Sequence, residues 1–179
     1  MKKLQRQIVK LLSSLILFSV CMNTYAEGFS DYRLGTGDKL SIKVFGEEEL
    51  SAEVTLSDAG TISYPFLGEI KVLGMTIGSL SKLITTRLAD GYLVNPSINV
   101  QVIEYREFYI NGEVKNPGAY PYQPGLTLQK AAALAGGFTE RASGSKMYVM
   151  HDGHTTRQKI RSGAKISPGD VITIEESFF

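Results

Sequence analysis

Residues 116–137 have the sequence NPGAYPYQPGLTLQKAAALAGG. Asn116-Pro117-Gly118-Ala119 has the pattern of a type II turn, because proline presets φ at the second position and glycine supplies the positive φ of the third. Pro124-Gly125 predicts a second turn. Thr127 is a good N-cap for the alanine-rich helix that follows, and Gly136-Gly137 is typical of a helix end. The stretch therefore predicts strand, turn, strand, turn and helix.

The segments around this stretch complete one small domain. Apolar and alternating runs predict strands at Phe108–Val114, Ala119–Tyr122, Lys146–His151, Thr155–Ile160 and Val171–Glu175. Asp152-Gly153 predicts a hairpin between the third and fourth of these strands. A further turn is expected before the last strand, at Ser167-Pro168-Gly169-Asp170. A hairpin, one helix laid across it and more strands outline a β-grasp fold.

The chain before residue 105 begins with a series of strands. Apolar and polar residues alternate over Lys39–Phe45, which indicates a half-buried strand. Asp58-Ala59-Gly60 predicts a hairpin that joins strands at Glu53–Leu56 and Thr61–Tyr64. After a turn at Pro65–Gly68, another short strand is expected at Glu69–Leu73.

One helix and one more strand follow in this half. Thr76 predicts the N-cap of a helix that ends at Gly91, and an apolar stripe on it comprises Ile77, Leu80, Leu83, Ile84 and Leu88. Ser97–Glu104 alternates again and predicts a strand. The predicted fold class is therefore α+β, without the strand–helix repetition that a parallel α/β enzyme needs.

The first 26 residues predict a secretory signal peptide. Four bases precede a short apolar run from Leu11 to Met22, and small residues at Thr24 and Ala26 suit cleavage between Ala26 and Glu27. The alternatives are an uncleaved anchor and a lipoprotein, but the apolar run is short for a span of roughly 20 residues. Val20 is a poor neighbour for a lipidated Cys21. We expect a periplasmic protein without lipid, with domains at residues 27–105 and 106–179.

Charge is nearly balanced but unevenly placed. Residues 27–179 carry 15 basic and 18 acidic side chains, which gives a net charge of −3 and no reason to expect nucleic acid as a partner. Glu27–Asp58 contains eight acids and three bases, whereas Arg141–Lys165 contains six bases and one acid. These stretches are either solvated surfaces or complementary faces for head-to-tail packing between copies.

The sequence predicts no enzyme, and we expect no catalytic residue, no metal site and no cofactor. Gly35-Thr36-Gly37 lacks the third glycine of a dinucleotide-binding loop. His151 and His154 flank a predicted turn and have no obvious third ligand for a metal. Glu47-Glu48-Glu49 lies on a predicted loop, where neighbouring carboxylates repel rather than form an acid–base pair, and no Gly-x-Ser-x-Gly motif is present.

Four tyrosines are candidates for contact with a glycan. They lie on or beside the strands around the quoted stretch, at Tyr105, Tyr109, Tyr120 and Tyr122. An aromatic face with a hydroxyl edge suits a sugar ring, and it also suits packing at a half-wet surface. Both roles stay open for each of these tyrosines at this stage.

Four stretches resemble a known family. The first three, YRLGTGDKLSIKVFGEEEL (32–50), DAGTISYPFLGEIKVLGMT (58–76) and LADGYLVNPSINVQVIEY (88–105), resemble the polysaccharide export domain of bacterial outer-membrane export proteins. FYINGEVKNPGAYPYQPGLTLQKAAALAGGFTERAS (108–143) is similar to the soluble-ligand-binding β-grasp (SLBB) domain that follows it in that family. Together they cover nearly all of the chain after the leader, in the order of the family.

The resemblance implies a role in transport. Members of the family assemble as rings of identical subunits into a periplasmic cylinder that guides capsule or exopolysaccharide to the cell surface. The implied partners are the polysaccharide, further copies of the chain, an outer-membrane β-barrel porin and an inner-membrane polysaccharide copolymerase. The alternative is a periplasmic glycan-binding or tethering module that forms no conduit.

Two departures from long family members shape this expectation. Those members carry several β-grasp domains and a C-terminal amphipathic helix that forms a pore, and they are usually lipoproteins. Here one such domain is followed by Glu175-Glu176-Ser177-Phe178-Phe179. We therefore expect a short export protein that relies on a separate barrel, with Phe178-Phe179 either docking on a partner or packing back on the core.

Overall fold

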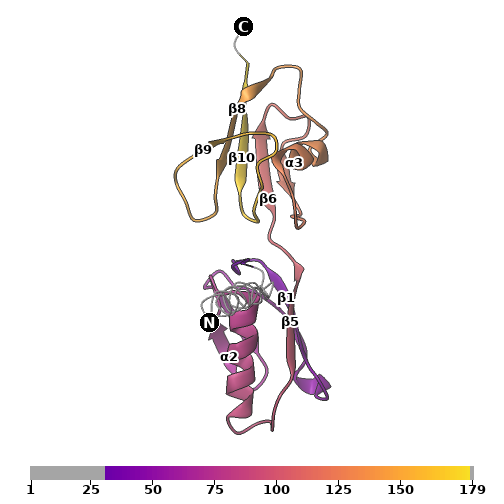
Figure 1. Ribbon diagram of the computed structural model, residues 1–179, viewed down its shortest axis with the longest axis vertical. Coiled ribbons are helices and arrows are strands. Elements are labelled where there is room, and N and C mark those ends of the chain that lie inside the picture. The colour runs from indigo at the N-terminus through magenta and orange to yellow at the C-terminus, as the bar shows by residue number, and fades with distance from the viewer. Residues whose placement is uncertain (1–30, 178–179) are drawn as a thin grey trace, which may run out of the picture.

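The structure is a computed structural model that describes residues 31–177. The predicted leader, its cleavage site between Ala26 and Glu27, Cys21 and the Phe178-Phe179 pair lie outside the described residues. Two hydrophobic cores follow one another along the longest axis of the molecule, and the chain passes from one to the other between β5 (Ile98–Glu104) and β6 (Phe108–Gly112) (Figure 1). We refer to the two halves as the first and the second domain.

The first domain packs one helix against a three-stranded sheet. Its elements are β1 (Lys39–Val44), η1 (Glu48–Leu50), β2 (Ala52–Thr55), β3 (Thr61–Tyr64), β4 (Gly68–Lys71), α2 (Ile77–Ala89) and β5. The sheet has the order β2-β1-β5 and is antiparallel throughout. As predicted, Leu40, Ile42 and Val44 are buried on one face of β1.

The helix α2 begins and faces the core as its sequence predicts. The Thr76 side chain accepts a hydrogen bond from the backbone N–H of Ser79, which satisfies one free donor of the first turn. Leu80, Ile84 and Leu88 are fully buried at helical spacing, and Ile77 and Leu83 are partly buried beside them.

The predicted hairpin between β2 and β3 is wrong. β2 pairs with β1, and β3 pairs only with β4 in a separate two-stranded sheet, with Ile62 opposite Ile70. The turn at residues 57–61 does form, because the backbone N–H of Gly60 donates to the carbonyl of Ser57. The strands then diverge, since the carbonyl of Gly60 accepts the N–H groups of Val72 and Leu73 and thereby holds the end of β4 at the turn.

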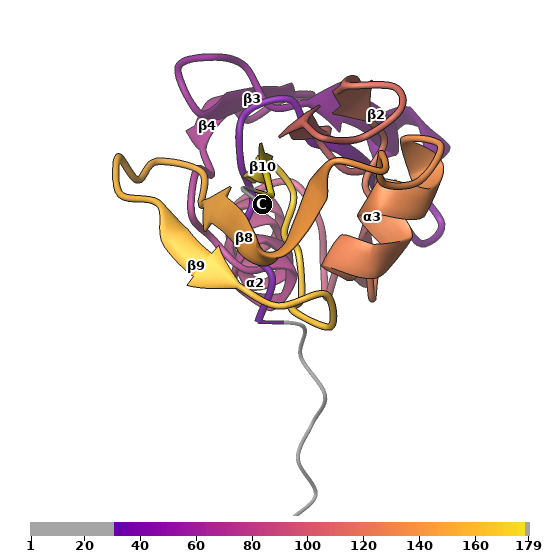
Figure 2. The same cartoon turned by 90° about the horizontal axis from the view of Figure 1, so that it is seen from above.

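The second domain is a five-stranded mixed sheet with one short helix. Its elements are β6, β7 (Gly118–Tyr120), α3 (Leu128–Leu134), β8 (Ala142–Met150), β9 (Gln158–Ile160) and β10 (Val171–Glu176). The order is β7-β6-β10-β8-β9, and only the central β6–β10 pair is parallel. Seen along the long axis, α3 and the β8–β9 hairpin lie on opposite sides of the domain (Figure 2). Both domains combine helix with mainly antiparallel sheet, and the fold class is α+β as predicted.

The opening stretch folds as a hairpin and helix, but its first turn differs from the prediction. Gly118 does not have a positive φ and instead begins β7, so residues 116–119 do not form a type II turn. The loop between β6 and β7 is longer and rests on the end of α3, where the N–H of Asn116 donates to the carbonyl of Ala135. Gly125 has φ 78°, in agreement with the second predicted turn, and Thr127 caps α3 by accepting from the N–H of Lys130.

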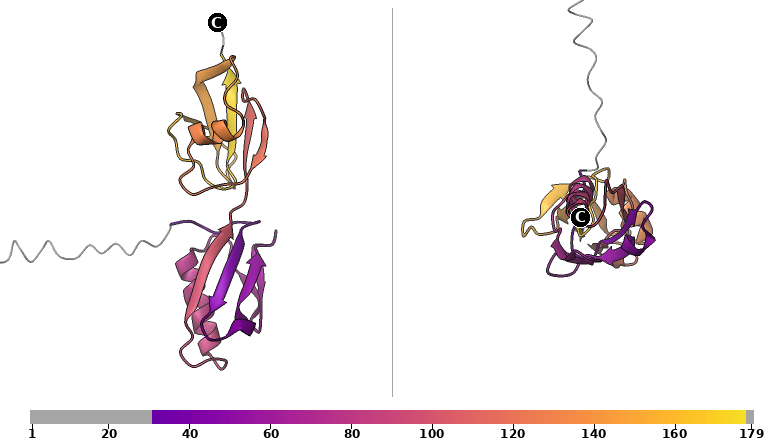
Figure 3. Two further views of the ribbon diagram at one scale, coloured as in Figure 1. Left: turned by 90° about the vertical axis from the view of Figure 1, so that its right-hand side faces the viewer. Right: turned by 90° about the horizontal axis from the view of Figure 1, so that it is seen from below.

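The left view of Figure 3 shows the two domains one above the other, joined by one strand-to-strand connection. Arg106 lies in this connection and contacts both domains, so the boundary between residues 105 and 106 stays a prediction. Among residues 31–177, neither helix has the length and apolar content that crossing a bilayer requires.

Candidate functional site

A buried carboxylate lies at the base of the connection between the domains. Asp38 is fully buried, and it follows the turn that precedes β1. Its Oδ2 atom accepts hydrogen bonds from the N–H of Gly35 at 2.8 Å and from the hydroxyl of Tyr32 at 2.5 Å. Its Oδ1 atom accepts from the backbone N–H of Arg106 at 3.0 Å. A buried charge is costly unless it is paired, and these donors provide that pairing.

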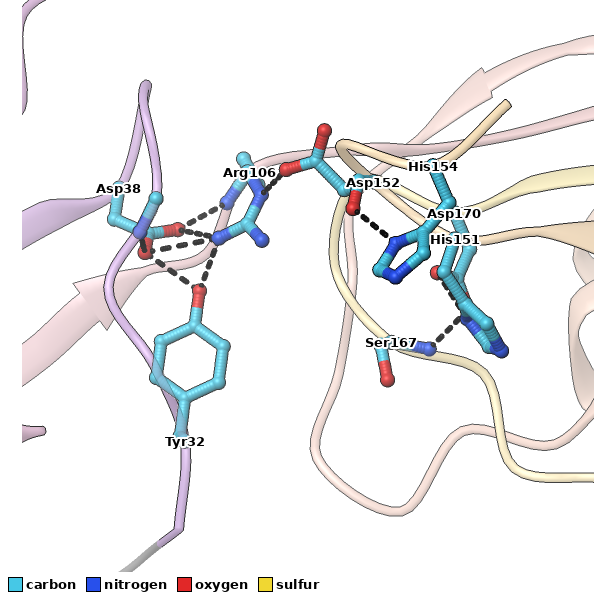
Figure 4. Close-up of polar contacts among 9 residues, drawn as sticks. Tyr32, Asp38, Arg106, His151, Asp152, His154, Ser167 and Asp170 are labelled. Carbon is cyan, nitrogen blue, oxygen red and sulfur yellow. Dashed lines mark hydrogen bonds and ion pairs between the residues drawn. The ribbon is translucent and has the colours of Figure 1, made fainter. Parts of the chain in front are cut away.

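Arg106 connects the first domain to the second (Figure 4). Its Nη1 atom lies 3.2 Å from Asp38 Oδ2 and donates to the hydroxyl of Tyr32 at 2.7 Å. Its Nε atom donates to Asp152 Oδ2, 3.1 Å away, in the loop between β8 and β9. The guanidinium therefore spans one carboxylate from each domain, a geometry that the planar fork of arginine suits and lysine does not.

Two glycines leave the space that the guanidinium occupies. A Cβ atom on Gly35 would lie 2.2 Å from Arg106 Nη1, and one on Gly169 would lie 2.9 Å from Arg106 Nε. Any side chain at either position would have to displace the arginine. The Gly-x-Gly-Asp pattern at residues 35–38, which resembled part of a nucleotide loop, instead admits the arginine and supplies its counter-charge.

Three tyrosines form a contact series beside this ion pair. The ring centroids of Tyr32 and Tyr105 are 5.0 Å apart, and those of Tyr105 and Tyr122 are 5.4 Å apart, both edge to face. Burial raises the pKa of Tyr32, and the hydrogen bond that its hydroxyl donates to Asp38 raises it further. Burial likewise raises the pKa of Tyr105 and of Tyr122. The series runs across the junction, because Tyr122 belongs to the second domain.

A second buried carboxylate secures the turn before β10. Asp170 Oδ2 accepts from the N–H of Ser167, and Asp170 Oδ1 lies 2.9 Å from Nδ1 of His151. His154 lies nearby with its ring centroid 6.3 Å from that of His151, and its Nδ1 faces the carbonyl of Asp152 (Figure 4). Within residues 31–177 no three histidine, cysteine or carboxylate side chains gather as a metal site would require.

A polar groove opens beside the junction. It has a volume of about 460 Å³ and is lined by residues of both domains, including Glu104, Glu107, Tyr109 and Asp152 around Arg106. The Tyr109 side chain is 48% exposed on β6. The groove offers carboxylates and backbone groups for hydrogen bonding and an aromatic ring for stacking. This combination suits a polar ligand such as a sugar.

The four predicted tyrosines have different environments. Tyr105 and Tyr122 contact each other at the junction, and Tyr105 and Tyr109 both line the groove. Tyr120 lies apart from them, stacked on Phe108 with ring centroids 5.9 Å apart and donating its hydroxyl to the carbonyl of Asn116. Sequence reasoning missed Asp38 and Arg106, which are 68 positions apart. The available signal was a single basic residue, Arg106, between the end of one predicted strand and the start of the next.

Comparison with known proteins places these two domains in one family. A family model described as "Polysaccharide biosynthesis/export protein" matches residues 27–103, and a model described as "SLBB domain" matches residues 108–156. The chain belongs to the polysaccharide export protein family. Its first domain is the export domain and its second is the SLBB domain, and Arg106 lies between the two matched segments.

Curated relatives carry names from polysaccharide production and transport. The exopolysaccharide production protein ExoF of Rhizobium meliloti (strain 1021) is 32% identical over 143 residues, which cover 72% of this chain and 34% of that protein. The EPS I polysaccharide export outer membrane protein EpsA of Ralstonia solanacearum is 29% identical over 185 residues, 80% of this chain and 48% of that protein. The polysialic acid transport protein KpsD of Escherichia coli is 25% identical over 136 residues, 74% and 24% of the two chains. The matched region thus spans between a quarter and a half of these relatives.

Proposed function

We propose that this chain acts in the export of an exopolysaccharide or capsular polysaccharide, as a subunit of a periplasmic ring through which the polymer passes. The single observation that supports this most is the export domain followed by an SLBB domain in one chain, and relatives named for exopolysaccharide production and export match 72% and 80% of this chain. Its partners would be the polysaccharide, further copies of the chain, an outer-membrane β-barrel porin and an inner-membrane copolymerase.

The junction supports a structural role for the chain in the wall of such a ring. Arg106 ties Asp38 of the export domain to Asp152 of the SLBB domain, and the tyrosine series adds apolar contact across the same boundary. A subunit whose domains are locked together can hold a passage of constant shape. The polymer would then be guided without any bond in it being broken, in line with the transport names of the relatives.

Tyr109 is the candidate glycan contact that the geometry favours among the four tyrosines. Its side chain is 48% exposed in the junction groove. Tyr105 lines the same groove but is less exposed and packs against Tyr122, and Tyr120 packs against Phe108. The same groove supports the second candidate function, a periplasmic module that binds or tethers glycan without forming a conduit. The two differ in assembly, since only the first requires a ring.

Deletion of the gene tests the export role. We expect loss of polysaccharide at the cell surface while synthesis of its repeat unit continues, with restoration by the wild-type gene. The polymer is measured in surface extracts and the lipid-linked repeat unit in membranes. If the purified protein cleaved or modified the polysaccharide, the transport role would be wrong. A strict monomer in native mass spectrometry, with and without the barrel partner, would instead favour the tethering module.

The proposed location has its own test. The predicted cleavage between Ala26 and Glu27 would release the chain to the periplasm without lipid. Mass spectrometry of the mature N-terminus measures this directly. A protein that begins with a diacylated Cys21 would contradict the prediction and place a lipid anchor on the chain.

The contact that we predicted between the acidic and basic stretches does not suit a flat ring. The described part of Glu27–Asp58 lies in the export domain and Arg141–Lys165 lies in the SLBB domain, at different heights along the long axis (Figure 1). Two of the bases are also engaged within the chain, because Arg141 pairs with Glu176 and Arg157 pairs with Glu175. In a flat ring, side-by-side contacts would then use other surfaces, and the two stretches would meet only between copies that follow one another along the long axis.

A further inference from the structure

Three loops at the free end of the export domain carry the most exposed large apolar side chains of residues 31–177. These are Phe45 after β1 at 87%, Phe66 between β3 and β4 at 64%, and Tyr92 and Val94 between α2 and β5 at 53% and 100%. We call this surface, defined by these four residues, the tip. An exposed apolar surface of this kind marks an interaction site more often than a scatter of single residues does.

The three loops are neighbours in space. The N–H of Phe45 donates to the carbonyl of Ser97, which joins the first loop to the third. The hydroxyl of Tyr92 donates to the carbonyl of Phe66 at 3.4 Å, and their rings lie edge to face with centroids 6.1 Å apart. The tip is therefore one surface, at the end of the export domain remote from Arg106.

Two residues of the tip loops have a backbone conformation that side chains other than glycine rarely adopt. Phe66 has φ 60° and Asn95 has φ 59°, and they are the non-glycine residues with positive φ among residues 31–177. Asparagine tolerates this region, whereas phenylalanine does so at a cost. The chain thus presents an exposed aromatic ring at a position where glycine or asparagine would be less strained. Strain combined with exposure points to a contact made by the Phe66 ring.

Acidic side chains border the tip. Glu47, Glu48 and Glu49 follow Phe45 and Gly46 in the chain. All three are exposed, and none of them forms an ion pair within residues 31–177. An apolar surface with this border disfavours an anionic lipid headgroup and favours a partner surface that is basic and partly apolar.

Such a surface lies in the SLBB domain, along the edge of its sheet. A hollow of about 620 Å³ is lined by Gly144, Ser145, Lys159, Ile160, Arg161 and Ser162. In the sheet, Met147 lies opposite Ile160 and Ala142 lies opposite Glu176, so residues 144–145 and 160–162 lie on the outer β8–β9 edge, in the half of the SLBB domain that is remote from the junction. Lys159 and Arg161 form no ion pair with any residue of the described segment.

We propose that the tip of one copy docks into the hollow of a second copy, end to end along the long axis. The aromatic rings of the tip would meet Ile160, and the glutamates would face Lys159 and Arg161. The two surfaces differ, so the contact is heterologous and can repeat from copy to copy. This axial contact goes beyond the side-by-side contacts of the proposed ring, because it would stack one ring on another and lengthen the conduit.

Two blocked variants of the full chain test the contact by sedimentation velocity and native mass spectrometry. Phe45→Ser with Phe66→Asn blocks the tip and keeps a residue that tolerates positive φ at position 66. Lys159→Glu with Arg161→Glu blocks the hollow. Each variant should weaken end-to-end association by about tenfold or more, as expected when central apolar anchors or a complementary charge pair are lost.

Mixing the two variants gives the decisive result. The hollow of the first and the tip of the second are intact, so the mixture should form pairs that do not grow further, although neither variant associates alone. Combining Glu48→Lys and Glu49→Lys with the blocked hollow in one chain should restore association. Gly144→Phe gives an independent block, because a Cβ on Gly144 meets no atom within 4 Å and the new ring would fill the hollow.

Matched controls separate these effects from general changes in charge or apolar surface. Lys71→Glu with Lys82→Glu makes the same change in charge on the export domain, and Ile103→Ser with Leu134→Ser removes exposed apolar side chains elsewhere. Both control variants should leave association unchanged. A wild-type chain that stays monomeric at millimolar concentration, or a mixture that forms no pairs, would overturn the proposal. If the tip variant still forms a ring with the mass of the wild-type ring, the axial contact and the ring are independent of each other.

Discussion

The aromatic residues at the junction and those at the tip differ in what surrounds them. Tyr32, Tyr105 and Tyr122 lie edge to face across the boundary between the domains, beside the Asp38–Arg106 ion pair. Phe45 and Phe66 extend from loops with most of their surface exposed. Both groups are aromatic and have carboxylates nearby. The junction rings pack within the chain, whereas the tip rings stay mostly exposed even though Phe66 contacts Tyr92 at its edge.

This difference separates residues that hold the molecule together from residues that are available for contact. A substitution at the junction removes a hydrogen bond or a packed ring that no other group replaces, so it should cost stability. A substitution at the tip removes an exposed and partly strained group, so it should cost little stability and act on association instead. The following predictions test this distinction.

The largest effect is expected from Arg106→Ala. The change leaves the fully buried carboxylate of Asp38 without its cation, and breaking a buried pair in this way costs about 3–5 kcal/mol. Urea denaturation measures the free energy of unfolding. The control Arg87→Ala removes an exposed arginine of α2 and should stay within about 0.5 kcal/mol of wild type. Equal stabilities of the two variants would mean that the ion pair does not secure the junction.

A single methyl group at Gly35 should have the next largest effect. In Gly35→Ala the new Cβ would lie 2.2 Å from Arg106 Nη1, so the arginine must move away from Asp38 and Tyr32. Overpacking of this kind costs about 1–3 kcal/mol. Gly144→Ala is the matched control, because its Cβ would meet open space. A thermal or urea titration in which both variants lose the same stability would contradict the close approach.

Removing the hydroxyl of Tyr32 should have a moderate effect that depends on pH. In Tyr32→Phe, the Asp38 carboxylate loses one donor, at a cost of about 1–3 kcal/mol at neutral pH. The pKa of Tyr32 is raised in the folded protein, so its contribution is fully present below the unfolded pKa of about 10 and is lost as pH rises above it. Wild type should therefore lose up to about 1.4 kcal/mol more per pH unit than the variant above pH 10. Parallel stability curves for the two proteins in alkaline buffer would refute this.

The smallest effect on stability is expected at the tip. Phe66→Asn relieves the strain of phenylalanine at φ 60° but loses the edge contact with Tyr92, so the two effects oppose each other. The free energy of unfolding should stay within about 0.5 kcal/mol of wild type. Calorimetry measures the shift. A large loss of stability would mean that Phe66 belongs to the core of the export domain, and the comparison with the junction would then fail.

Local features of the fold were predictable where one short segment contains the whole signal. The alternation of Leu40, Ile42 and Val44 identified β1, and Thr76 and Thr127 identified the starts of α2 and α3. Each of these depends on residues that lie within a few positions of one another. The order of the two domains also followed from motifs that are contiguous in the chain.

Predictions that depended on pairing between segments were less secure. The turn at residues 57–61 was correct, but β2 pairs with β1 and β3 with β4, because the carbonyl of Gly60 binds the end of β4 rather than extending a ladder with β2. Gly118 was expected to have a positive φ, but it lies in β7 because the loop before it docks on the end of α3. In both cases a distant contact overrode a local turn preference.

By itself, the sequence determined the fold class, most strands, the two helix caps and the family, because periodicity, capping and contiguous motifs are properties of neighbouring residues. Only the tertiary structure decided that Asp38 would meet Arg106, that Tyr105 and Tyr122 would pack together and that Tyr109 would line a groove. The tertiary structure also decided that Phe45 and the other tip residues would be exposed at the free end of the export domain. These features depend on which segments are brought together in space, and burial and hydrogen-bond partners are set only when distant parts of the chain meet.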